Sequence, residues 1–197
     1  MRRNEERKEK QKQIWMGIIL VAVMVFSIFG IMVGNDSSTL RYGNYKFQIG
    51  SDNKVYTEVS NGNLVGFRYL PQDLENITLP EGTIQLLRNA PIIVTTFNPN
   101  YEKTWVLTHL ETIEFEMSKE LEGKYIYNGV TEASEAYVSF PMINCSNATQ
   151  QQPGIYFEIS NETSITRQDS CIILKSDGTG FYALKDRLLY SYFGVIE

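Results

Sequence analysis

The sequence is poor in the side chains on which most metal sites and many enzymes depend. His109 is its only histidine, which excludes a metal site built from several histidines. A Ser-His-Asp triad would need His109 as its base, and no G-x-S-x-G motif accompanies it. The 177–180 loop is not an EF-hand and is too short to cradle a phosphate. The sequence therefore predicts no metal and no cofactor, and it gives no positive evidence for an enzyme.

Cysteine is almost as scarce, since Cys145 and Cys171 are the only two. Their spacing is not C-x-x-C, and Arg167 and Lys175 are the only nearby cations that would stabilise a thiolate, which argues against redox chemistry. An even pair in an oxidising compartment is typical of a disulfide. We predict a structural disulfide, with two free buried thiols as the alternative.

Positive charge is scarce outside the first 13 residues. Those residues hold six basic and three acidic side chains, a net +3, so the overall −5 leaves −8 for the rest of the chain. A nucleic-acid partner requires a basic face, and an anionic lipid surface repels a domain of this charge. The composition therefore excludes nucleic acid as an expected partner.

Long apolar runs are absent with one exception, residues 14–34, which contain no charge. A helix of this length spans roughly 31 Å, close to the thickness of the bilayer hydrocarbon core. A cleaved signal peptide is the alternative, but its apolar core is shorter and ends in an A-x-A-like site. We expect a single transmembrane helix. Gly30 and Gly34 form one G-x-x-x-G, which leaves helix pairing, and so a homo-oligomer, open.

The charges that flank this segment predict its orientation. Lysine and arginine concentrate in residues 1–13, and such residues stay on the cytoplasmic side. We therefore expect a cytoplasmic tail at 1–13, a polar stalk at 35–42 and an extracytoplasmic domain at 43–197. The predicted location is the cell membrane, with a single pass.

Five N-x-[ST] sequons follow the apolar segment, more than chance predicts for this composition, although a fluctuation would also explain them. Such sequons are glycosylation sites in exterior proteins. The acceptors are Asn35, Asn76, Asn144, Asn147 and Asn161.

The exterior domain begins with a pattern of period two. Residues 44–70 alternate apolar and polar side chains and contain two turns, one of them with the Asn61-Gly62 hairpin signal. We predict a three-stranded antiparallel meander there.

The rest, residues 83–197, has an α/β order, with α+β as the alternative. We expect a strand at 83–87, a buried strand at 91–97, and a helix that Asn98 and Pro99 begin and that runs to about 121. Strands at 124–130 and 155–160 follow, with 137–142 as a candidate extended segment. A strand pair at 163–166 and 171–174 and a helix at 181–193 complete the domain. The crossover from 91 to 130 should be parallel.

This order resembles the thioredoxin-like core, with residues 155–160 forming a hairpin with 163–174. The resemblance covers residues 91–194 and implies a mixed sheet with two helices. Where that family has its C-x-x-C, this chain has Phe97, Asn98, Pro99, Asn100 and Tyr101, so dithiol chemistry is not implied.

Three segments are also similar to single-span envelope proteins of archaea without an assigned activity: FNPNY at 97–101, PGIYFEISNET at 153–163 and DRLLY at 186–190. This resemblance implies a membrane anchor and an external domain, and no activity.

Two groups of polar residues are candidate sites. The 97–101 loop leads from a strand end into a helix, where α/β proteins bind ligands, and the candidate residues are Thr96, Asn98, Asn100 and Tyr101. Plain helix capping is the alternative. Five glutamates at 111, 114, 116, 120 and 122 crowd one helix. Paired acids or a Ca²⁺ site are conceivable, but we interpret these residues as a solvated face.

Two functions follow from these observations. The first is a membrane-anchored exterior domain that binds another envelope protein or a glycan. The second is a small-ligand binder or enzyme that uses the 97–101 loop.

Overall fold

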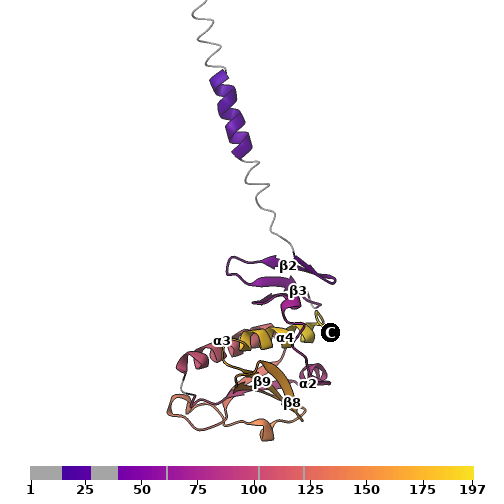
Figure 1. The fold of residues 1–197 in the computed structure, drawn as a ribbon, viewed down its shortest axis with the longest axis vertical. Helices are drawn as coiled ribbons and strands as arrows, with labels where there is room; N and C mark the ends of the chain where they lie inside the picture. The colour runs from indigo at the N-terminus through magenta and orange to yellow at the C-terminus, as the bar shows by residue number, and fades with distance from the viewer. Residues whose placement is uncertain (1–14, 28–39, 61, 102, 122) are drawn as a thin grey trace, which may run out of the picture. The chain divides into compact units, whose positions relative to one another are not determined.

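The computed structural model describes residues 15–27, 40–60, 62–101, 103–121 and 123–197 (Figure 1). The chain divides into two compact units, Met1–Thr39 and Leu40–Glu197. The mixed α/β class predicted from the sequence is confirmed for the second unit, which contains an antiparallel meander and a mixed sheet with helices.

In the first unit, residues 15–27 are helical and their apolar side chains are exposed, with Trp15 at 66% and Phe26 at 76%. None of the helices among the described residues has both the length and the apolar character needed to cross a membrane. The predicted tail at 1–13, position 14 and residues 28–39 lie outside the described residues, so the predicted span is described only in part. Gly30, Gly34 and Asn35 fall in this undescribed part.

The second unit begins with a four-stranded antiparallel meander in the order β1-β2-β3-β4. Its strands are β1 (Leu40–Tyr42), β2 (Tyr45–Ile49), β3 (Val55–Glu58) and β4 (Leu64–Phe67). The predicted meander is confirmed, but the prediction of three strands and of a stalk reaching residue 42 is wrong. Leu40 pairs with Phe47 and Tyr42 with Tyr45, so the residues assigned to the end of the stalk form an edge strand.

A five-stranded mixed sheet follows in the order β6-β5-β7-β9-β8. Its strands are β5 (Ile92–Phe97), β6 (Tyr125–Val130), β7 (Gly154–Ile159), β8 (Ser164–Gln168) and β9 (Cys171–Ser176). The parallel pairing of β5 with β6 confirms the predicted crossover. The predicted hairpin between 155–160 and 163–174 is wrong, because β7 pairs in parallel with β9 and β8 lies beyond β9 at the edge.

Three α-helices accompany the sheets: α2 (Thr83–Asn89), α3 (Thr104–Glu120) and α4 (Phe181–Phe193). Short 3-10 turns lie at Pro71–Asp73, Glu135–Tyr137 and Cys145–Asn147. The strand expected at 83–87 is therefore a helix. Its buried residues Thr83, Leu86 and Leu87 lie at the spacing of one helical face. In a run this short, the apolar pattern does not distinguish a helix from a strand. The extended segment expected at 137–142 reduces to one bridge, between Met142 and Val130.

Helices α3 and α4 lie between the two sheets (Figure 1). Tyr190 on α4 stacks on Phe67 of the meander, with ring centroids 3.8 Å apart, and Phe181 meets Phe157 of the mixed sheet. The last helix was expected to bury one face, but every residue from Leu184 to Tyr190 is buried. Because a sheet covers each side of the helix layer, α4 holds both sheets in one hydrophobic core.

The disulfide predicted from the sequence is confirmed, since Cys145 and Cys171 are bonded. Cys171 begins β9 and is fully buried, whereas Cys145 opens the 3-10 turn in the segment between β6 and β7. The bond therefore ties this long connection to the middle of the sheet.

We expect Cys145→Ala with Cys171→Ala to lower the free energy of unfolding by about 3 kcal/mol, because the unfolded chain loses a closed loop. Urea unfolding of the full chain, with and without reductant, measures this effect. The native chain should lose stability in reductant and the double variant should not. Equal midpoints for the two oxidised proteins would contradict the prediction.

Candidate functional site

The predicted ligand loop does not cap a helix. Helix α3 begins at Thr104, its N-cap position is Lys103, and no side chain caps it. Asn98 Oδ1 instead accepts a hydrogen bond from the backbone N–H of Asn100 at 2.9 Å, which closes a local turn. The expected cap by Asn98 is therefore wrong, because the chain turns once after β5 before the helix starts.

The four predicted loop residues do not share one cavity. Asn98 lines a hollow of about 500 Å³, together with Glu132, Tyr156 and Glu158. Asn100 and Tyr101 line a different hollow of about 480 Å³. Thr96 is buried and its hydroxyl donates to the carbonyl of Ile143 at 2.7 Å, so its role is structural.

Four of the predicted glycosylation acceptors lie in the described residues, and all are exposed: Asn76, Asn144, Asn147 and Asn161. Asn144 and Asn147 also cap the 3-10 turn that holds Cys145, because each side chain accepts a hydrogen bond from the turn's backbone. A glycan is attached through the amide nitrogen Nδ2, so these caps, which use Oδ1, leave the attachment atom free.

A network of charged side chains joins the meander to the helix layer. The ammonium of Lys185 on α4 is fully buried and lies 2.9 Å from Glu116 Oε2, 3.5 Å from Glu120 Oε2 and 3.0 Å from Asp186 Oδ1. The contact with Asp186 is an ion pair without hydrogen-bond alignment. Glu116 Oε1 also receives Lys54 at 2.8 Å and Arg68 at 2.9 Å, and both of these come from the meander side.

The interpretation of the α3 glutamates as a solvated face is wrong for Glu114, Glu116 and Glu120. Burial acts to raise the pKa of Glu116, but the hydrogen bond from Lys54 and the charges of Lys185 and Arg68 outweigh it and hold the pKa at about 2. Burial raises the pKa of Glu120 to about 7, because its long contact with Lys185 offsets burial only in part. Glu122 lies outside the described residues.

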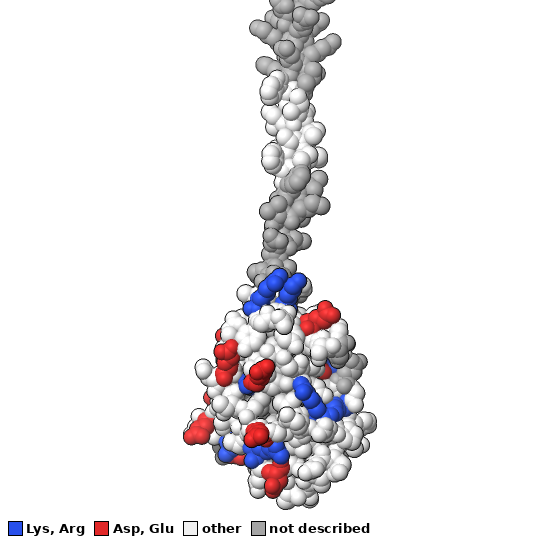
Figure 2. All heavy atoms as spheres, turned by 90° about the vertical axis from the view of Figure 1, so that its right-hand side faces the viewer, with Lys and Arg blue, Asp and Glu red and all other residues white. Residues whose placement is uncertain are grey.

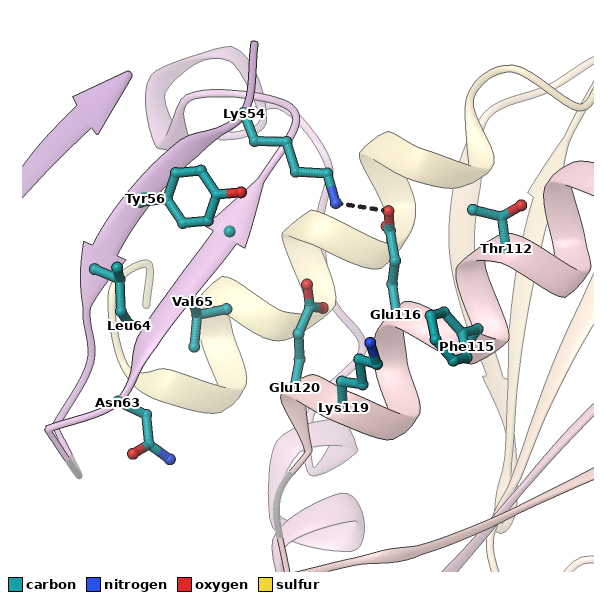
Figure 3. A pocket seen from close by; sticks show the side chains of 11 residues that line it. Lys54, Tyr56, Asn63, Leu64, Val65, Thr112, Phe115, Glu116, Lys119 and Glu120 are labelled. Carbon is teal, nitrogen blue, oxygen red and sulfur yellow. Dashed lines mark hydrogen bonds and ion pairs between the residues drawn. The ribbon is translucent and has the colours of Figure 1, made fainter. Parts of the chain in front are cut away.

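A hollow of about 410 Å³ opens beside this network, between β3, β4 and α3 (Figure 3). Glu116 and Glu120 project from α3 toward the meander, and Lys54 reaches Glu116 from the other side. Each of these charged groups has a partner inside the protein. These ion pairs therefore connect the two halves of the core, and they do not form a group of unpaired charges that a ligand would neutralise.

The free edge of the mixed sheet lies at β6. Its odd-numbered residues face β5, as the bonds from Tyr125 N to Pro91 O and from Thr131 N to Phe97 O show. The even-numbered residues therefore point their backbone groups outward. Val130 is paired there with Pro141 and Ile143, but within the described part of the chain no strand or loop pairs with the backbone of Ile126 or Asn128.

Exposed apolar side chains surround this edge. We call them the β6 surface, and its members, with their exposed fractions, are Phe115 (58%), Tyr125 (62%), Tyr127 (45%), Val138 (85%) and Met142 (66%). No residue of β6 is charged, although charge is a common protection of exposed edges. The opposite edge strand, β8, carries Arg167. Sequence reasoning missed this surface, because the strand order that leaves β6 at an edge is not visible in the strand itself.

One face of the domain carries charges of both signs. On the face shown in Figure 2, acidic and basic side chains are interspersed among uncharged ones, and no field of one sign forms.

Comparison of the sequence and the fold with known proteins found no matching family model, no similar curated protein and no similar solved structure.

Proposed function

We propose that the chain is a membrane-anchored exterior protein that binds a partner protein by accepting one of its extended segments along β6. The observation that carries this proposal is the pair of outward backbone positions, Ile126 and Asn128, that lack partners among the described residues. An added strand satisfies such N–H and C=O groups, and the side chains that flank them select the partner.

The anchored, exterior placement is supported by the sequence and by the disulfide. Residues 14–34 contain no charge, and the preceding residues hold the clustered lysines and arginines. The Cys145–Cys171 bond fits an oxidising compartment, and the four described sequon acceptors are exposed.

A protein segment fits the β6 surface better than other partners do. Tyr125 and Tyr127 are aromatic side chains of the kind enriched at protein interfaces, and their rings lie 4.8 Å apart. The neighbouring Val138 and Met142 enlarge the apolar area. A glycan would stack on the tyrosines but would leave the backbone groups of Ile126 and Asn128 unsatisfied.

The test is the composition of the native complex after gentle extraction in detergent. The full chain should be recovered with a second protein, in a particle well above 22.6 kDa plus glycans. Tyr127→Lys should remove that protein and leave a folded, lone chain, because it places a charge on the edge. Ile49→Lys is the matched control, since Ile49 is also exposed (51%) on a strand, but in the meander.

Three results would contradict the proposal: a lone wild-type monomer, retention of the partner by Tyr127→Lys, or equal loss of the partner from Ile49→Lys. If the recovered protein is a second copy of this chain, the β6 edge serves self-association and not the binding of a different protein.

A small polar ligand is the second candidate function, and the hollow beside Asn98 favours it. The hollow presents an amide, two carboxylates from Glu132 and Glu158, and the Tyr156 ring on the outer face of the sheet. A lone monomer in the extraction would favour this function, and loss of ligand binding in Asn98→Ala would then locate the site.

A further inference from the structure

A hollow of about 620 Å³ lies between α3 and the free edge at β6. It is lined by residues of α3, of β6 and of the 139–141 segment. The lining residues that matter for its chemistry are Glu114, Phe115, Tyr125, Tyr127, Asn128 and Phe140. No lysine, arginine or histidine is among the described residues that line it.

Glu114 differs from the other buried acids because no cation neutralises it. Glu114 is 1% exposed, and neither of its carboxyl oxygens has a hydrogen-bond partner among the described residues. The Thr95 hydroxyl lies nearby but donates to Asn128 Oδ1 at 3.0 Å. Glu116, only two positions along the helix, has three cationic partners. An unpartnered buried carboxyl of this kind is costly unless a ligand completes its environment.

The aromatic rings of the hollow add attraction for a cation. The face of an aromatic ring is electron-rich, so an ammonium group placed over it is stabilised. Phe115 already shows this behaviour, because the ammonium of Lys119 lies 4.2 Å from its ring centroid. Phe140 is a further aromatic residue of the lining. Tyr125 and Tyr127 also line the hollow, but their side chains project from the opposite face of the sheet to Asn128, which bonds to Thr95 on the α3 side.

We propose that this hollow binds an alkylammonium group, which pairs with the Glu114 carboxylate and packs its methylene groups against Phe115 and Phe140. In the assembled complex the ligand is a lysine side chain of the segment that adds to β6, and only this identification of the source rests on the proposed function. In strand addition the backbone supplies affinity and a side-chain pocket supplies specificity. The hollow lies beside Ile126 and Asn128, where such a pocket is needed.

The proposal predicts a particular pH dependence. Burial raises the pKa of Glu114 to about 8, with the charge of Glu111 acting in the same direction, so the empty site is mostly protonated at pH 7. An ammonium group binds the ionised form, and binding therefore releases a proton below pH 8. The other titratable groups near Glu114 are Tyr137, whose pKa of about 12 keeps it neutral, and the tyrosines of β6.

The test uses n-butylammonium chloride and the full chain in a non-ionic detergent, with 1-butanol as the neutral probe of the same length. NMR titration should show that butylammonium binds and that its affinity rises about tenfold per pH unit up to pH 8, then levels off. Calorimetry in buffers of different ionisation enthalpy should show close to one proton released per ligand at pH 6.5 and none at pH 9. Butanol should bind more weakly, without pH dependence.

Glu114→Gln should weaken butylammonium binding at least about tenfold at pH 8.5 and remove its pH dependence. Glu162→Gln, at an exposed position in the turn after β7, should bind as the native chain does. Butylammonium binding no tighter than butanol, or equal binding by Glu114→Gln, overturns the proposal. This test is independent of the extraction test. If a complex forms but butylammonium does not bind, only the proposed lysine pocket is wrong. If butylammonium binds but no complex forms, only the proposed partner protein is wrong.

Discussion

Replacing the buried Lys185 by methionine is expected to lower the free energy of unfolding by about 3–5 kcal/mol at neutral pH. The methionine fills nearly the same space, so the loss comes from electrostatics. Without the ammonium, Glu116 keeps Lys54 and Arg68, but Glu120 and Asp186 lose the one cation that contacts them within the described part of the chain. Urea unfolding of the full chain in detergent measures the change.

Lys54→Met is the matched control, because Lys54 contacts the same Glu116 from a partly exposed position. Its expected cost is below about 1 kcal/mol, since exposed ion pairs contribute little. The loss from Lys185→Met should shrink at pH 5, where Glu120, with its pKa of about 7, binds a proton and no longer needs a cation. A loss that equals that of Lys54→Met would show that the network does not hold the halves of the core together.

The bounds of α4 could be predicted from the sequence, but the burial of its charged residues could not. Residues 181–193 were predicted as a helix with the bounds that are observed, because apolar residues recur at helical spacing. The same helix contains Lys185, Asp186 and Arg187, and all three side chains are buried. A helix covered on both sides must bury its charges with partners, and the sequence does not show that those of Lys185 come from α3. The α3 glutamates were misread for the same reason.

The sheet shows a similar limit. The strands β5, β6, β7 and β9 were placed nearly correctly from their apolar runs, but not the order in which they pair. The short turn after β7 suggested a hairpin, whereas β9 takes the place beside β7. The thioredoxin-like resemblance depended on that hairpin, so it remains a prediction for the β5–α3–β6 part alone. The free edge at β6 could not be predicted, because it follows from the pairing order.

The candidate ligand loop was located correctly at a strand end, but its geometry was not predictable. Asn98 and Pro99 match a helix start in sequence, and both also suit a turn. The side chain of Asn98 bonds within that turn, and its amide donates to Glu132, which lies 34 residues further on. Such long-range partners decide whether Asn98 lines a hollow or caps a helix, and they are not visible in the sequence.

Glu114→Gln is expected to make the protein more stable at high pH. Burial raises the pKa of Glu114 from its ordinary value of 4.5 to about 8, so the folded state holds a proton that the unfolded state has released between these pH values. Stability therefore falls as the pH rises from 4.5 to 8, by up to about 5 kcal/mol for this group. Glutamine stays neutral, and the variant should lose this part of the slope.

The measurement is the free energy of unfolding of both proteins at pH 5 and pH 8.5. Their difference should be small at pH 5 and should favour the variant by about 4–5 kcal/mol at pH 8.5. Glu120 contributes a slope of the same sign, but it does so in both proteins and cancels in the difference. Glu162→Gln, at an exposed position in the turn after β7, should change neither value. A difference that does not vary with pH would mean that Glu114 is ionised or solvated in the folded protein. A gain at pH 8.5 would show that the carboxyl group is retained at a cost to stability, as expected for a residue kept for a ligand.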